Sequence, residues 1–124
     1  MSASPRRGSS VQKLRPTKRL RVFVGEDERY RGRPLFEAVV LAAREHGLAG
    51  ATVFKGFMGY APHGGISTTS ILRLAENLPV VVDIVDDEER IRAFLPFLRR
   101  AVKTGLVICS DVESEQIVPE DEQN

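Results

Sequence analysis

The stretch LPVVVDIVDD, residues 78–87, indicates which kind of fold this chain adopts. From Val80 to Val85 every position is apolar except Asp83, so the segment predicts a strand with two apolar faces. Pro79 fits the start of that strand, where the missing N–H removes no ladder hydrogen bond. A sheet built around such a strand needs apolar cover on both sides.

A helix is predicted directly after this strand. The acidic run Asp86 to Glu89 suits a helix N-terminus, where carboxylates accept hydrogen bonds from free N–H groups and favour the dipole. A metal site there is disfavoured, because adjacent acids on a helix point in different directions. Pro96 lies within the apolar stripe and is expected to kink the helix, and Gly105 is expected to end it before a strand at 106–109.

The chain before residue 78 shows the same kinds of element. Apolar alternation predicts a strand over 20–24, and helical spacing predicts a helix that begins at Pro34 and ends before Gly47. A further strand is predicted over 51–57. The order is therefore βαββαβ, the ferredoxin-like α+β plan, with a four-stranded antiparallel sheet and two helices on one face.

The second face of this sheet has no predicted helix to cover it. Val81 and Val85 lie on the face opposite Val80, and Phe23 lies opposite its apolar neighbours in the first strand. Another copy of the chain is the simplest cover, so we expect a symmetric homo-oligomer. Asp83 needs a partner, because an unpaired buried carboxylate is unfavourable; pairing at an oligomer contact is favoured over a ligand role.

Length and charge indicate one domain with two charged tails. The chain has 124 residues and a net charge of +1, with basic residues gathered between 6 and 21 and acidic residues between 113 and 122. We expect a disordered basic tail over 1–17, a folded domain over 18–117 and a disordered acidic tail over 118–124. Such charge runs are typical of solvated ends, so no nucleic-acid partner is expected.

The remaining composition favours a soluble, cytoplasmic protein. The one cysteine, Cys109, follows an apolar run and is expected to be a small buried hydrophobe, and a disulfide framework is excluded. The N-terminal residues lack the apolar segment of a secretory signal, and no run approaches the ~18 apolar residues of a membrane span.

The loop GFMGYAPHGGISTTS, residues 56–70, is the candidate ligand site. Its glycines allow close backbone approach and an anion-binding nest, its aromatic rings offer stacking surfaces, and its hydroxyl groups can donate hydrogen bonds. It matches no Walker or dinucleotide pattern, so a plain mobile loop and a ligand site both stay open. The candidate ligand-binding residues are Gly56, Phe57, Gly59, Tyr60, Gly64, Gly65, Ser67 and Thr68.

No catalytic constellation or metal motif is predicted. His46 ends a helix and His63 lies in the loop, and neither has a second ligand at metal-binding spacing. The chain also lacks the G-x-S-x-G nucleophile motif. Two alternatives stay open: a small enzyme that pairs Glu26 with His63, and a metal-binding trimer that joins His63 from three copies.

Three long segments of the chain carry a family pattern: RLRVFVGEDERYRGRPLFEAVVLAAREHGLAGATVFKGFMGY (19–60), GGISTTSILRLAENLPVVVDIVDDEERI (64–91) and FLPFLRRAVKTGLVICSDV (94–112). They include Gly25-Glu26, Pro34-Leu35 and Leu78-Pro79. These segments resemble the DUF190 family, also called UPF0166, of PII-like proteins, and the resemblance covers residues 19 to about 117.

The resemblance implies a non-enzymatic signalling protein that forms a PII-like homotrimer and binds an adenine nucleotide in clefts between subunits. The loop over 57–77 would relay occupancy to a protein partner, with a membrane transporter as the candidate class by analogy. Gly56, Phe57, Gly59 and Tyr60 would form the loop base near the ligand, with Ser67 and Thr68 on its far side.

PII proteins that bind triphosphates carry a glycine- and lysine-bearing loop where this chain has only Lys103-Thr104-Gly105. AMP or ADP is therefore favoured over ATP. Tyr60 lies at the loop base, which gives no support to regulation by uridylylation.

Overall fold

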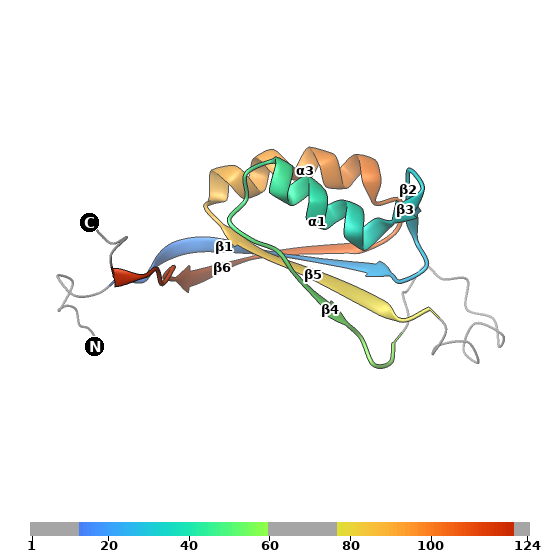
Figure 1. Cartoon of the computed structure of the whole chain (residues 1–124), viewed down its shortest axis with the longest axis horizontal. Helices are drawn as coiled ribbons and strands as arrows, with labels where there is room; N and C mark the ends of the chain where they lie inside the picture. The colour runs from blue at the N-terminus through green and yellow to red at the C-terminus, as the bar shows by residue number, and fades with distance from the viewer. Residues whose placement is uncertain (1–12, 60–76, 121–124) are drawn as a thin grey trace.

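The computed structural model describes residues 13–59 and 77–120. Its elements are β1 (Arg15–Gly25), β2 (Arg29–Tyr30), β3 (Arg33–Pro34), α1 (Leu35–Glu45), β4 (Thr52–Lys55), β5 (Pro79–Asp86), α3 (Glu88–Ala101) and β6 (Leu106–Ser114). Four strands form an antiparallel sheet in the order β4-β5-β1-β6, and α1 and α3 lie together on one face of it (Figure 1). The predicted ferredoxin-like α+β arrangement is confirmed.

The core lies between this sheet and the two helices. Alternate residues of β1 and β5 face the helices and are buried, as the period of two requires; Val22 and Val82, which pair across the two strands, are both 0% exposed. Phe94 and Ile91 of α3 belong to the same buried cluster and pack against these strand side chains from the helix side. The helix continues through Pro96 and ends at Ala101, before the predicted stop at Gly105.

The opposite side of the sheet, called the open face below, carries a continuous apolar row. Strand pairing places Phe54 beside Val81, Val81 beside Phe23, and Phe23 beside Leu106, so one residue from each strand contributes. Phe54 and Leu106, at the two ends of the row, are each 53% exposed. Nothing within the described part of the chain covers this row, which is the uncovered apolar face that the sequence predicts.

Asp83 lies on the open face, one row away from these side chains. Arg21 Nε and Nη2 donate hydrogen bonds to Asp83 Oδ1 and Oδ2 over 2.8 and 2.7 Å. Asp83 therefore has a charged partner within the chain, while its predicted place at an oligomer contact stays a prediction. The hydrogen bonds from Arg21 lower the pKa of Asp83, because they favour its charged form.

The ends of the sheet extend further than predicted. β1 begins at Arg15, inside the segment expected to be disordered, and Thr17 is 6% exposed with its hydroxyl 2.8 Å from that of Ser114. The reason is that β6 also runs on, to Ser114, and supplies a partner for the start of β1. Three basic residues near the N-terminal end lie in β1 and form ion pairs: Arg15 with Asp87, Lys18 with Asp111 and Arg21 with Asp83. Of the predicted tails, residues 1–12 and 121–124 lie outside the described residues.

Two local predictions were wrong. Cys109 is exposed rather than buried, because β6 is at the sheet edge while the helices pack over the central strands. The second error concerns only the capping bond: Glu88 and Glu89 lie in the first turn of α3 as predicted, but Asp87 precedes the helix without a side-chain capping bond. Asp86 instead accepts hydrogen bonds from the backbone N–H groups of Ala49 (2.9 Å) and Asp87 (2.6 Å), and the bond from Ala49 ties the end of β5 to the segment before β4.

The β2–β3 hairpin was not predicted. It turns through Arg31 and Gly32, whose φ angles are +50° and +84°, the pattern of a two-residue type I′ turn. Leu35 at the start of α1 donates its N–H to Glu28 O over 2.7 Å, so the hairpin is fixed to the helix. Neither helix of the described segments has the length and apolar content needed to cross a membrane.

Candidate ligand site at the base of the central loop

Three backbone segments meet where β4 ends and β5 begins. Gly56 N donates a hydrogen bond to Pro79 O over 2.7 Å, which continues the β4–β5 ladder past Lys55. Glu26 N, in the turn after β1, donates to Leu78 O over 2.9 Å. Asn77 Oδ1 accepts from Asp27 N at 3.0 Å. The ends of the central loop are therefore held against the β1 turn, and these contacts define the loop base.

Pro79 lies against two glycines of the loop base. A Cβ atom at Gly56 would come within 2.6 Å of Pro79 Cγ and 2.9 Å of Pro79 O, distances that real Cβ contacts do not show. At Gly59 it would lie 3.0 Å from the same Pro79 Cγ. The close approach at these glycines is thus made by the first residue of β5, and the approach of a ligand to them stays a prediction.

Three charged side chains at the loop base are already engaged. Lys55 Nζ and Glu26 Oε2 form an ion pair over 2.7 Å, and the hydrogen bond from Lys55 lowers the pKa of Glu26. Glu28 Oε2 accepts a hydrogen bond from Gly25 N at 2.8 Å. A carboxylate held in its charged form is a weak proton acceptor, so this geometry gives no support to Glu26 as a general base.

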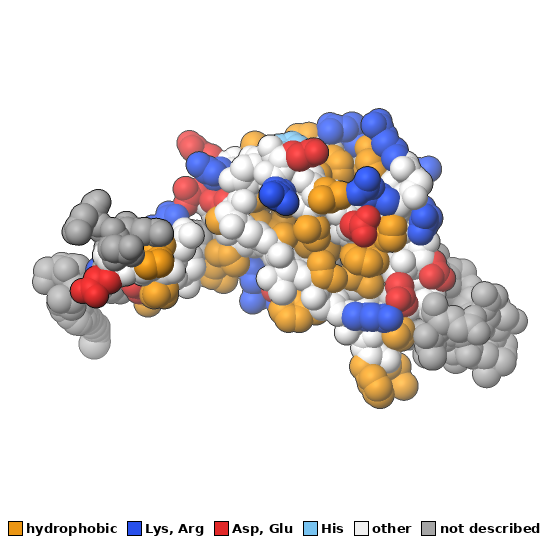
Figure 2. Space-filling model, in the orientation of Figure 1, with side chains coloured by type: hydrophobic (Ala, Val, Ile, Leu, Met, Phe, Trp, Pro, Cys, Tyr) orange, Lys and Arg blue, Asp and Glu red, His pale blue; other side chains and the backbone are white. Residues whose placement is uncertain are grey.

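Apolar side chains at the loop base extend into solvent. Phe57 is 93% exposed and Met58 is 70% exposed. Figure 2 shows hydrophobic side chains gathered at the tip where β4 ends. Phe54, three residues earlier in the chain, belongs to the apolar row of the open face, so the loop base adjoins that uncovered surface.

The structure brings together only part of the predicted site. Gly56 and Gly59 lie against Pro79, and Phe57 is beside them in the chain. The other candidates, Tyr60, Gly64, Gly65, Ser67 and Thr68, lie outside the described residues, as does His63. Within residues 13–59 and 77–120, no cluster of three or more His, Cys, Asp or Glu side chains could hold a metal ion.

Sequence reasoning missed the residues that complete the loop base, namely Asn77, Pro79 and the Lys55–Glu26 pair. The sequence pattern places Pro79 only at the start of a strand. The signal that could have indicated its contact is the glycine pair itself, since glycines near a strand end often mark a close approach by another backbone segment.

The fold is the PII-like fold, as two solved structures show. A protein from Thermus thermophilus described as a "putative PII-like signaling protein" superimposes with a TM-score of 0.60 at 15% identity, over 84% of this chain and 94% of that one. CPII, a nitrogen regulatory PII-like protein from Thiomonas intermedia bound to ADP, AMP and bicarbonate, gives 0.60 at 18% identity, over 83% and 99%.

The chain belongs to the DUF190 family, described as "Uncharacterized ACR, COG1993", whose model matches residues 17–114. A UPF0166 protein of Aquifex aeolicus is 41% identical over 96 residues, which are 77% of this chain and 90% of that protein. One from Methanocaldococcus jannaschii is 36% identical over 93 residues, or 74% and 85%. The family predicted from the sequence is confirmed.

Proposed function

We propose that this chain is a non-enzymatic signalling protein that assembles as a PII-like homotrimer and binds an adenine nucleotide between subunits. AMP or ADP is the expected ligand, in preference to ATP. The loop over 57–77 relays occupancy of the site to a protein partner, for which a membrane transporter is the expected class.

The open face supports the trimer. Its apolar row crosses all four strands of the sheet, and the side chains at both ends of the row are half exposed in the single chain. Burial of such surface stabilises an assembly by about 25 cal/mol for each Å² removed from water. A closed ring of copies, with the sheets inward and the helices outward, covers this surface without leaving a free edge for further growth.

One observation carries the nucleotide site: the loop base adjoins the open face. A ligand bound there would lie at the margin of the surface that a neighbouring subunit covers. Phe57, at 93% exposure, offers a ring on which adenine can stack. The PII-like neighbour CPII has been seen with ADP and AMP, which agrees with this ligand class.

The connection between α3 and β6 supports a ligand with few phosphates. It consists of residues 102–105, and a Cβ at Gly105 would lie only 2.7 Å from Phe23 O. The turn therefore packs directly on β1, and little chain is left to surround a triphosphate. A short phosphate chain makes less demand on this segment.

Signalling requires that the ligand favour one conformation of the loop over another, because a ligand with equal affinity for both would leave their populations unchanged. The engagement of Glu26 by Lys55 favours a binding role over acid–base chemistry at this site. The enzyme and metal alternatives both need His63, and each has a direct test: turnover of the nucleotide on long incubation, and metal analysis of the purified protein.

Calorimetric titration with AMP, ADP, ATP and cyclic AMP tests the proposal, with the mass measured in parallel by light scattering. We expect a trimer that binds AMP or ADP saturably. Gly59→Val should abolish binding and leave the trimer intact, because its methyl groups fill the space beside Pro79. Gly50→Val is the matched control, since a Cβ at Gly50 has no atom within 4 Å. A trimer that binds none of the four nucleotides would refute the nucleotide site.

A further inference from the structure

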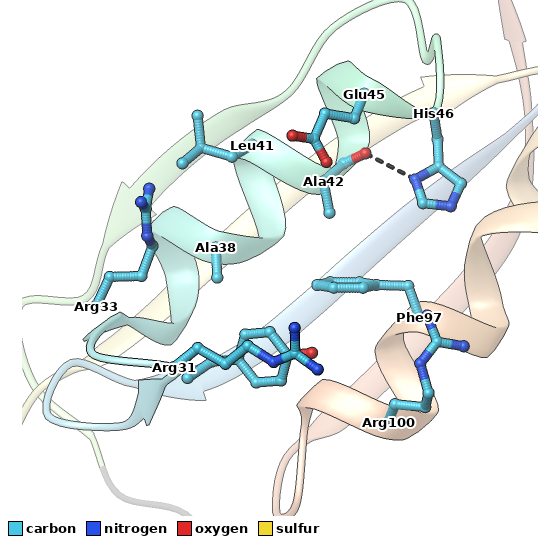
Figure 3. A pocket seen from close by; sticks show the side chains of 10 residues that line it. Arg31, Arg33, Ala38, Leu41, Ala42, Glu45, His46, Phe97 and Arg100 are labelled. Atoms are coloured by element: carbon cyan, nitrogen blue, oxygen red, sulfur yellow. Dashed lines mark hydrogen bonds between the residues drawn. The ribbon is translucent and has the colours of Figure 1, made fainter.

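A second concave site lies on the helix side of the sheet, away from the loop base. It is a groove of about 550 Å³ between α1, α3 and the β2–β3 hairpin (Figure 3). Because it lies on the face opposite the open face, it stays accessible in a trimer that buries the open face. An inference about this groove therefore does not depend on the proposed function.

The groove has a rigid aromatic and apolar lining. Phe97 is 9% exposed, and its ring meets that of Tyr30 edge-on, with centroids 5.8 Å apart, and stacks on that of Phe94 at 5.5 Å. Leu41, 38% exposed, contributes an apolar side chain from α1. Rings fixed in this way offer a planar ligand a surface that loses little conformational freedom on binding.

Two arginines that line the groove have no carboxylate partner within residues 13–59 and 77–120. Arg31 comes from the hairpin and Arg100 from α3, on the other side of the groove (Figure 3). Arg31 lies over the Tyr30 ring, with Cζ 5.3 Å from the centroid, which holds its guanidinium at the groove. Arg33 also lines the groove, but its Nη1 forms an ion pair with Glu37 Oε1 over 3.6 Å. The carboxylate in the lining, Glu45, comes from the end of α1 that is away from the hairpin.

The backbone at Arg31 adds an independent observation. Its φ of +50° lies in the left-handed region, and Arg31 is the one non-glycine among the described residues with a positive φ. Asn, Asp or Gly is preferred at this position of a type I′ turn. An arginine held there against its backbone preference points to a role for the side chain, since strained residues gather at functional sites.

We propose that this groove binds a small organic anion made of a planar ring and a phosphate. The ring lies on the lining formed by Phe97 and Leu41, and the phosphate lies between Arg31 and Arg100. Two guanidinium groups from separate elements suit a phosphate better than a carboxylate, because a phosphate has three terminal oxygens and carries close to two charges.

Titration of the ¹⁵N-labelled full chain with phenyl phosphate, followed by NMR, tests the site. We expect saturable shifts at Arg31, Gly32 and residues 97–100, with a Kd on the order of 1 mM for a ligand of this size. Inorganic phosphate lacks the ring and benzoate lacks the dianion, so each should bind at least about fivefold more weakly. Shifts confined to Gly56 and Gly59, or equal affinity for phenyl phosphate and benzoate, would overturn the proposal.

Three variants separate a binding role from a structural one. Arg31→Asn should weaken phenyl phosphate binding at least about fivefold while Tm stays equal or rises, because Asn suits the turn. Arg100→Gln should weaken binding to a similar degree. Arg99→Gln, next to it on α3 but outside the groove, makes the same change of charge and should leave the affinity unchanged. Wild-type affinity for phenyl phosphate in Arg31→Asn, or an equal loss of affinity in Arg99→Gln, would show that the arginines of the groove do not bind the phosphate.

Discussion

Replacing Gly56 by alanine tests whether the close contact at the loop base is as tight as the structure shows. The new Cβ would lie 2.6 Å from Pro79 Cγ and 2.9 Å from Pro79 O, whereas ordinary contacts are 3.4–4 Å. Both atoms belong to a strand residue, so relief requires movement of the β4–β5 ladder. Overpacking of this kind costs about 1–3 kcal/mol.

The same movement weakens the hydrogen bond from Gly56 N to Pro79 O, now 2.7 Å long, which contributes about 1 kcal/mol. Gly56→Ala should therefore lower the free energy of unfolding by about 2–4 kcal/mol, or Tm by roughly 6–15 °C for a chain of this length. Differential scanning calorimetry at one fixed protein concentration measures this, since Tm of an oligomer depends on concentration.

Gly50→Ala is the control for the glycine-to-alanine change itself. A Cβ at Gly50 meets nothing within 4 Å, so the substitution only restricts the unfolded chain and should change stability by between zero and about +1 kcal/mol. If Gly56→Ala unfolds at the same temperature as Gly50→Ala, Pro79 does not lie against Gly56 as described, and the account of the loop base is wrong.

Three further predictions concern the open face and the loop. Arg21 lowers the pKa of Asp83, so this pair stabilises the fold above the ordinary pKa of 3.8, and the contribution is lost as pH falls through the lowered value. Asp83→Asn should therefore make the stability of the fold less dependent on pH below 3.8 in acid denaturation experiments, and an unchanged dependence would contradict the pairing. Val81→Asp should convert the proposed trimer to monomers in light scattering, because it places a charge within the apolar row, whereas Ala93→Asp on the exposed side of α3 should not. Phe57→Ala should leave Tm unchanged, since the side chain is 93% exposed, but weaken AMP binding by about 5- to 150-fold through loss of stacking; equal affinity would remove Phe57 from the site.

The order of the main elements could be predicted because each depends on neighbours in sequence. Val80, Val82 and Ile84 share one face of a strand by the period of two, and the same alternation exposes Val81 to the other face. The end of α1 followed from Gly47, whose φ is +78°. The family resemblance rests on the same local patterns, which explains why it was recognisable from the sequence.

The candidate site was predictable only in part. Glycines in a loop indicate a close approach but do not say which atoms approach, so Gly56 and Gly59 were predicted and Pro79 was missed. The burial of Cys109 was predicted wrongly for a similar reason, since an apolar run does not reveal whether its strand is central or at an edge.

By itself the sequence determined the strands, the two helices of the core, the faces they bury and the excess of apolar surface on one side of the sheet. These follow from periodicity, which operates over a few residues. The tertiary structure alone decided that Pro79 closes the loop base, that Lys55 engages Glu26, and that Arg31 and Arg100 share one groove. Those contacts join residues tens of positions apart, and they exist only because strand order and helix packing bring distant segments together.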